Sequence, residues 1–228
     1  MEMLQTPEFW IGLLKIIWIN IILSGDNAVV IAMAARTLPE HQQRKAVLWG
    51  SGAAVIMRIA LTVVAAKLLA LPYLQIVGGL LLLWIGVQLL SEEDDEEEGE
   101  AKHHGTMMAA IRTILIADLI MSLDNVIAVA AAAQGSLTLL ILGLAISIPL
   151  VIFGATLMVK LMERFPIIVV AGAGLIGWVA GETIVGDAVL ADFLAANHWL
   201  LYAGAVAGAI VVIGLGKLLQ ARSRAEAA

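Results

Sequence analysis

Two short stretches of the chain place acidic and amide side chains inside long apolar runs. They are Ser24-Gly25-Asp26-Asn27 and, 98 residues later, Ser122-Leu123-Asp124-Asn125. The same offset aligns Asn20 with Asp118. A carboxylate at the centre of a bilayer costs at least ~2.5–3.5 kcal/mol on insertion scales, so an acid at such a position is a functional candidate by default. The repeated pattern therefore predicts a cation site.

All side chains of this predicted site offer oxygen atoms. They comprise the carboxylates of Asp26, Asp118 and Asp124, the amides of Asn20, Asn27 and Asn125, and, as supporting groups, the hydroxyls of Ser24 and Ser122. Oxygen ligands suit hard divalent ions such as manganese, magnesium or calcium and disfavour copper and zinc. The alternative is that these groups join helices through hydrogen bonds, as Asn and Ser often do in membranes.

The spacing within the second stretch predicts how these groups are presented. Asp118, Ser122 and Asn125 follow one another at i, i+4 and i+7 and share one helix face. Asp124 lies about 120° from that face on an ideal helix, so it joins the site only if the helix bends or unwinds, or it faces another partner. In the first stretch Ser24-Gly25 is such a weak point, and unwound backbone there would expose carbonyl oxygens as further ligands.

Arg58 is the basic residue expected to balance the charge of this site. It falls midway through an apolar run and requires a carboxylate partner. Three aspartates and one arginine leave a charge of -2, which a divalent cation neutralises. Without the cation the site favours proton uptake, a physical basis for proton coupling. The alternative is a structural ion pair, or an arginine that extends to the membrane surface.

The composition requires lipid as the solvent. The 228 residues are 61% hydrophobic and 14% charged, with a mean hydropathy of +0.98, too apolar for a soluble domain of this length. The formal charge of -6 comes from the acidic run at residues 92–100. The chain has no cysteine, which excludes disulfides and thiolate metal sites. We expect no removable signal peptide, because no basic segment precedes the first apolar run.

Seven apolar runs approach or exceed the roughly 20 residues that a membrane-spanning helix needs. All are predicted to be helices, because open strand edges do not persist in hydrocarbon. The expected spans are Phe9–Ala35, Ala46–Leu69, Tyr73–Leu90, Met107–Ala133, Leu137–Leu161, Ile167–Val185 and Trp199–Leu219. Ten Lys and Arg residues fall on one side of this topology and two on the other. The positive-inside rule then places the N-terminus outside and the C-terminus in the cytosol of a multi-pass protein of the cell membrane.

The two halves of the chain are related along most of their length. At offsets of 93 to 94, Gly50 aligns with Gly143, Pro72 with Pro166 and Trp84 with Trp178. Each half contains three spans, an odd number, so the second half runs inverted through the membrane. The prediction is an all-α membrane protein with a 3+3 inverted repeat and one additional helix, a plan that many secondary transporters share. It comprises repeat one at 9–90, an acidic cytosolic linker at 91–106, repeat two at 107–186 and a last helix at 199–219.

The blocks "SGDNAVVIAMAAR" and "DLIMSLDNVIAVAAA", joined by a charged linker, resemble the TerC family of integral membrane proteins, in particular its short members. The likeness extends from about Trp10 to Leu219. It implies a manganese(II) exporter of the wider lysine-exporter superfamily. The acidic motif residues of the family correspond to Asp26, Asp118 and Asp124. Longer members carry additional helices or soluble domains that this sequence lacks.

The remaining polar features are less specific. The linker "SEEDDEEEGEAKHHG" is expected to be solvated, with metal collection by His103 and His104 as the alternative. Glu182, near the outer end of the sixth span, is interpreted as a rim carboxylate or as part of an exit path. No nucleophile–base pair stands out, so we expect no enzyme.

Two functional hypotheses follow. The first is a secondary transporter that exports manganese(II) as its substrate, with protons as the candidate coupling ion. The second is a non-transporting membrane scaffold that helps assemble or metallate partner proteins. Neither requires nucleic acid or a permanently bound cofactor.

Overall fold

The structure, a computed structural model, describes residues 7–22, 25–68, 71–91, 106–133 and 136–227. These residues form helices and turns and contain no strand, which confirms the all-α prediction. The elements are α1 (Pro7–Ile22), α2 (Gly25–Arg36), α3 (Glu40–Leu68), α4 (Leu74–Ser91), α5 (Met107–Ala133), α6 (Leu137–Arg164), α7 (Ile167–Val185), the short 3-10 helix η3 (Ala188–Leu190), α8 (Ala191–Ala196) and α9 (Trp199–Ala227).

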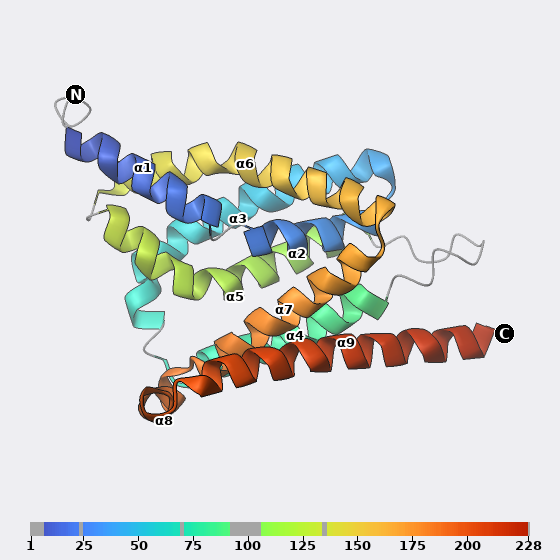
Figure 1. Cartoon of the computed structure of the whole chain (residues 1–228). Helices are drawn as coiled ribbons and strands as arrows, with labels where there is room; N and C mark the ends of the chain where they lie inside the picture. Colours follow the sequence, from blue (N-terminus) through green and yellow to red (C-terminus); the bar gives the residue numbers. More distant parts are fainter. Residues whose placement is uncertain (1–6, 23–24, 69–70, 92–105, 134–135, 228) are drawn as a thin grey trace.

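The predicted first span, Phe9–Ala35, contains two described helices. Helix α1 ends at Ile22 and α2 begins at Gly25, and their axes point in different directions in Figure 1. Of the predicted weak point Ser24-Gly25, Ser24 lies outside the described residues, and Gly25 is the first residue of α2. The matching span of the second half, α5, is one continuous helix.

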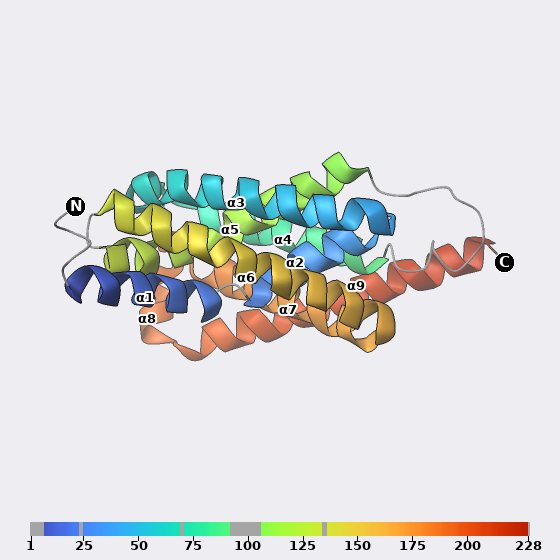
Figure 2. The same ribbon diagram turned by 90° about the horizontal axis from the view of Figure 1, so that it is seen from above.

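The long helices run back and forth between the two ends of the molecule, and the start of α1 and the end of α9 lie at opposite ends (Figures 1 and 2). Helix α3 packs along α5, α1 and α2 pack against α6, and α4 packs against α7. The largest apolar cluster among the described residues lies mainly between α2, α4, α5, α6 and α7.

Helix α9 covers α7 at very short range because glycines line both helices. Gly177 and Gly181 of α7 lie against Gly208 and Gly204 of α9, and a Cβ atom added at Gly181 would overlap the Gly204 carbonyl. Small residues four apart let helix backbones approach closely in membranes.

The loop after α7 holds the start of α4 through Asp187. The side chain is fully buried, and its carboxylate accepts hydrogen bonds from the backbone N–H groups of Tyr73 (3.1 Å), Gln75 (3.0 Å), Ile76 (3.2 Å) and Val189 (2.9 Å). Burial acts to raise the pKa of Asp187, but the four hydrogen bonds act against it, and the pKa is lowered from its usual value. The carboxylate therefore links the two halves of the chain as an N-terminal cap of α4.

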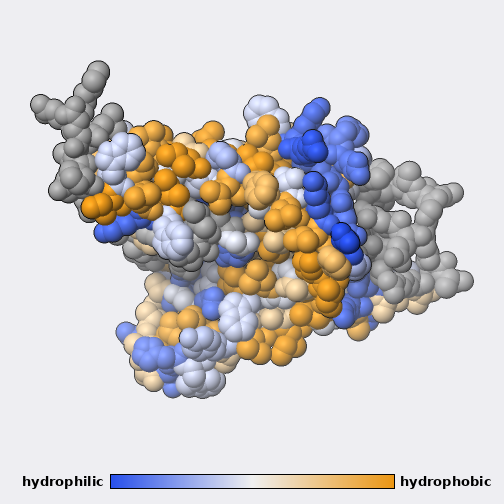
Figure 3. Space-filling view, turned by 45° about the horizontal axis from the view of Figure 1, so that its top comes forward, coloured by the Kyte–Doolittle hydropathy of each residue, from blue (hydrophilic) through white to orange (hydrophobic). Residues whose placement is uncertain are grey.

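The described helices include five that are long and apolar enough to cross a membrane, so the chain is a multi-pass membrane protein. They are Glu40–Thr62, Leu74–Ser91, Thr138–Arg164, Ile167–Val185 and Trp199–Ser223. Large apolar side chains such as Trp49, Phe153 and Ile210 are exposed on these helices. Figure 3 shows apolar side chains across the middle of one face, with hydrophilic side chains gathered towards the end where α3 begins and α6 ends.

Candidate metal site between α2, α3 and α5

A buried ion pair connects α3 to α5 in the middle of the molecule. Nη2 of Arg58 lies 2.5 Å from Oδ1 of Asp118, and both side chains are 6% exposed. The hydroxyl of Ser122 donates to the other carboxylate oxygen, Oδ2, over 3.2 Å. A buried charge needs a partner of opposite sign together with hydrogen bonds. Asp118 therefore provides the carboxylate partner that the sequence requires for Arg58.

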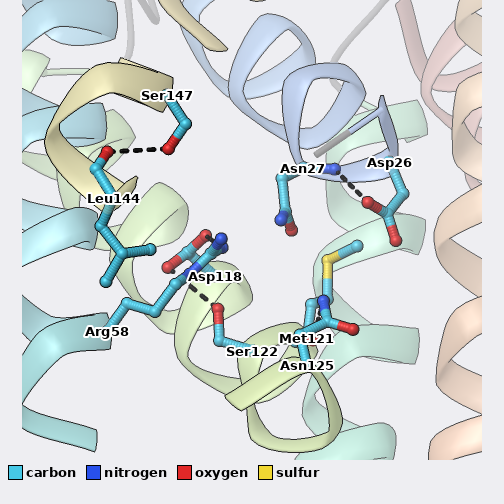
Figure 4. A network of polar contacts seen from close by, with 9 residues as sticks. All are labelled: Asp26, Asn27, Arg58, Asp118, Met121, Ser122, Asn125, Leu144 and Ser147. Carbon is cyan, nitrogen blue, oxygen red and sulfur yellow. Dashed lines mark hydrogen bonds and ion pairs between the residues drawn. The ribbon is translucent and has the colours of Figure 1, made fainter. Parts of the chain in front are cut away.

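Helix α2 contributes the second carboxylate of this region. Asp26 lies in the first turn of α2, where the helix dipole favours a negative charge, and the backbone N–H of Asn27 donates to its Oδ1 over 2.8 Å. In Figure 4 the side chains of Asp26 and Asn27 extend from α2 towards the polar residues of α5.

Asn125 completes the polar face of α5. Its Nδ2 donates to the carbonyl of Met121 over 3.0 Å, which leaves the amide oxygen as the atom that can ligate a cation. Ser122 and Asp118 precede it on the same face (Figure 4). Helices α2 and α5 are packed against each other, so carboxylate, amide and hydroxyl oxygens from the two related stretches meet at one interface.

Residues 5–224 match the family described as integral membrane protein TerC family. The chain belongs to the TerC family. It is 47% identical to the uncharacterized membrane protein YjbE of Bacillus subtilis over 188 aligned residues. These residues cover 82% of this chain and 85% of YjbE. It is also 25% identical over 234 residues to the uncharacterized membrane protein YceF of Bacillus subtilis, covering 99% of the chain and 90% of the relative.

A longer relative is the UPF0053 inner membrane protein YoaE of Escherichia coli. The identity is 28% over 188 residues, which are 75% of this chain and 36% of YoaE. The chain thus spans only about a third of that relative. No solved structure matches the chain.

Five of the predicted site residues have described side chains and lie at the interface of α2 and α5, next to Arg58 of α3. They are Asp26, Asn27, Asp118, Ser122 and Asn125, with Arg58 as the cation. The side chains of Asn20 on α1 and Asp124 on α5, and the whole of Ser24, lie outside the described residues. Among the side chains that are described, no three of the types His, Cys, Asp and Glu lie close enough to hold a metal.

Glu182 belongs to a different environment. Its carboxylate accepts a hydrogen bond of 2.8 Å from Nε1 of Trp178, one turn earlier on α7. No hydrogen bond joins it to the predicted site residues whose side chains are described.

The structure adds two serines that the sequence analysis did not single out. Ser147 of α6 is 3% exposed, donates to the Leu144 carbonyl over 2.7 Å and lies in the same polar region as Arg58 (Figure 4). Ser51 is 2% exposed, and its hydroxyl has no hydrogen-bond partner among the described residues. Ser51 precedes Arg58 by seven residues, a spacing that places both on one face of α3. This spacing is the sequence signal that could have identified Ser51.

Proposed function

We propose that this TerC family protein is a secondary transporter that exports a divalent metal cation, most favourably manganese(II), across the cytoplasmic membrane. The observation that carries the proposal is that Asp26 and Asn27 of α2 and Asp118 and Asn125 of α5 lie in one polar region between packed helices, where Arg58 pairs with Asp118. Two carboxylates and one guanidinium leave a charge of -1. The sequence prediction also assigns Asp124 to the site, which would bring the charge to -2. A divalent cation of the oxygen-preferring class balances that charge.

The packing of glycines supports a seven-span fold with a 3+3 inverted repeat. A Cβ atom at Gly50 of α3 would meet Ile114 of α5 at 2.8 Å, and one at Gly143 of α6 would collide with Ile16 of α1. Gly50 and Gly143 are equivalent in the sequence repeat, and so are Ile16 and Ile114, at the offset of 98. The contact of α3 in repeat one with α5 in repeat two thus has its counterpart in the contact of α6 in repeat two with α1 in repeat one. Figure 1 shows α5 running opposite to α1 and α2.

This arrangement provides for both binding and movement of the ion. Because the last carbonyl groups of a helix have no partner within it, we further propose that those of α1 act as additional oxygen ligands. A rocking movement of one repeat against the other would then expose a site at their interface to each side in turn. Asp118 is held by Arg58 and Ser122, and we propose that this pairing keeps the affinity low enough for the ion to leave.

Location and coupling follow from the same proposal. The related YoaE is described as an inner membrane protein, and we propose the cytoplasmic membrane for this chain, with the N-terminus outside and the C-terminus in the cytosol. Protons are the proposed coupling ion, since carboxylates without a metal take up protons. The protein carries out no chemical transformation in this proposal and needs no resident cofactor.

Manganese tolerance of cells tests the proposal. Expression of the wild-type protein should raise tolerance and lower cellular manganese, whereas Asp26→Asn and Asp124→Asn should remove both effects while the protein still inserts. The amide keeps the shape of the side chain but removes charge, which also lowers the cost of insertion. Asp192→Asn on α8, an exposed position, is the matched control. Full tolerance in the Asp26→Asn strain would favour the scaffold function instead.

A further inference from the structure

A polar cavity opens between the first turns of α3 and the last turns of α6, away from the candidate metal site. Its volume is about 390 Å³, and its lining includes Glu40 and Arg44 from α3 and Lys160 and Glu163 from α6. The lining positions recur at three- and four-residue intervals on both helices, so two polar stripes face each other. Val47 forms part of the apolar floor. Hydrophilic side chains gather at this end of the molecule in Figure 3.

The cavity contains two negative and two positive side chains that do not neutralise each other by direct contact. No ion pair joins Glu40, Arg44, Lys160 and Glu163 among the described residues, and the contact of Glu163 is a hydrogen bond of 3.4 Å from Nε2 of Gln43. A metal ion in this cavity would be repelled by the two bases as much as it is attracted by the two acids. A ligand that carries both an anionic and a cationic group can instead contact all four.

The position of the cavity indicates a lipid rather than a soluble ligand. It lies at the ends of two helices that are each apolar and long enough to span the membrane. On the membrane side of the cavity, large apolar side chains of α3 and α6 are exposed, among them Leu48, Trp49, Phe153 and Leu157. Tryptophan favours the boundary between membrane and water. A headgroup in the cavity would thus leave its acyl chains against an apolar surface.

We propose that this cavity binds the headgroup of phosphatidylethanolamine. The phosphate contacts Arg44 and Lys160, and the primary ammonium donates hydrogen bonds to Glu40 and Glu163. Phosphatidylcholine fits less well because its quaternary ammonium has no N–H group and is recognised by aromatic side chains. No Phe, Tyr or Trp belongs to the described lining of the cavity. The proposal does not depend on metal transport.

Lipid binding to the purified full-length protein, measured by native mass spectrometry, tests the assignment. The ligands are phosphatidylethanolamine, phosphatidylcholine and phosphatidylglycerol with identical acyl chains, and soluble phosphoethanolamine. The variants are Glu163→Gln, Lys160→Gln and, as the matched control, Lys217→Gln, an exposed lysine of α9. All three change exposed side chains, and circular dichroism verifies that each variant is folded.

The wild-type protein should bind phosphatidylethanolamine roughly tenfold more tightly than the other two lipids, a difference of ~1.4 kcal/mol. Glu163→Gln should remove the preference for phosphatidylethanolamine over phosphatidylcholine. Lys160→Gln should weaken the binding of phosphatidylethanolamine and phosphatidylcholine alike, and Lys217→Gln should change neither affinity. Equal wild-type affinity for the three lipids would overturn the proposal, as would an equal effect of Lys160→Gln and Lys217→Gln. Phosphoethanolamine binding as tight as the lipid would show a soluble zwitterion to be the ligand and would overturn the lipid assignment.

Discussion

Removal of Arg58 is the most informative perturbation of the buried ion pair. In Arg58→Ala the carboxylate of Asp118, 6% exposed, keeps the hydrogen bond from Ser122 but loses its guanidinium. Breaking a buried pair by deleting one partner costs ~3–5 kcal/mol. At about 2–4 °C per kcal/mol for a chain of this size, the melting temperature should fall by roughly 6–20 °C.

A double variant separates the stabilising role of the pair from a role of Asp118 in metal binding. Replacing both partners by apolar residues of similar volume, as in Arg58→Met with Asp118→Leu, is often neutral or stabilising by ~1–4 kcal/mol. The double variant should therefore regain most of the melting temperature. It should still fail to transport manganese, because an oxygen ligand is missing.

Thermal unfolding in detergent and manganese binding to the same samples provide the assay, with Arg222→Ala, an exposed residue of α9, as the control. Folded Arg58→Ala protein should bind manganese more tightly and release it more slowly, since the site becomes more negative by one charge. A melting temperature of Arg58→Ala equal to that of the control would refute the reasoning about the pair. Full transport by the double variant would remove Asp118 from the site.

Three further predictions concern the scaffold around the site. Asp187→Asn should lower the free energy of unfolding at about pH 7 by ~2 kcal/mol, the scale of hydrogen bonds to a charged group. Because folding lowers the pKa of Asp187, the stability difference between wild type and variant should be complete above the unfolded-state pKa of about 3.9 and should vanish as the pH falls through the folded-state pKa. Melting curves between about pH 7 and 3 would record this change. Gly181→Ala should destabilise the α7–α9 contact by ~1–3 kcal/mol, whereas Gly214→Ala, which has open space around it, should not, and equal melting temperatures would contradict this. Single cysteines, introduced into a chain that has none, should label from the cytosol at Arg44 and from outside at Asn197; labelling from one side would exclude the proposed topology.

The helices were largely predictable because a lipid-facing segment must be both apolar and internally hydrogen-bonded. Helices α5 and α7 begin and end at the predicted residues. Helix α3 begins at Glu40 instead of Ala46, since its polar first turns extend beyond the apolar run, and the end of α9 extends beyond Leu219 for the same reason. Hydropathy marks where a helix can be buried in lipid, and a helix continues beyond that limit where water solvates it.

The polar site was predictable only in part. The spacing of Asp118, Ser122 and Asn125 identified their common helix face. Because a buried arginine needs a counter-charge, the sequence also predicted a carboxylate partner for Arg58, but it did not identify which one. That partner depends on how α3 packs against α5, which no local pattern encodes. The cap formed by Asp187 was missed for a similar reason, because three of its four hydrogen-bond donors lie 111 to 114 residues earlier in the chain.

Manganese flux through the purified protein tests the proposed function most directly. Proteoliposomes loaded with a manganese-sensitive fluorophore should respond to external manganese when they contain the wild-type protein, and the response should depend on an imposed pH gradient. Those that contain Asp26→Asn should respond no more than empty liposomes, whereas Asp192→Asn should behave as the wild type. A wild-type response equal to that of empty liposomes, or an undiminished response from Asp26→Asn, would contradict transport through this site.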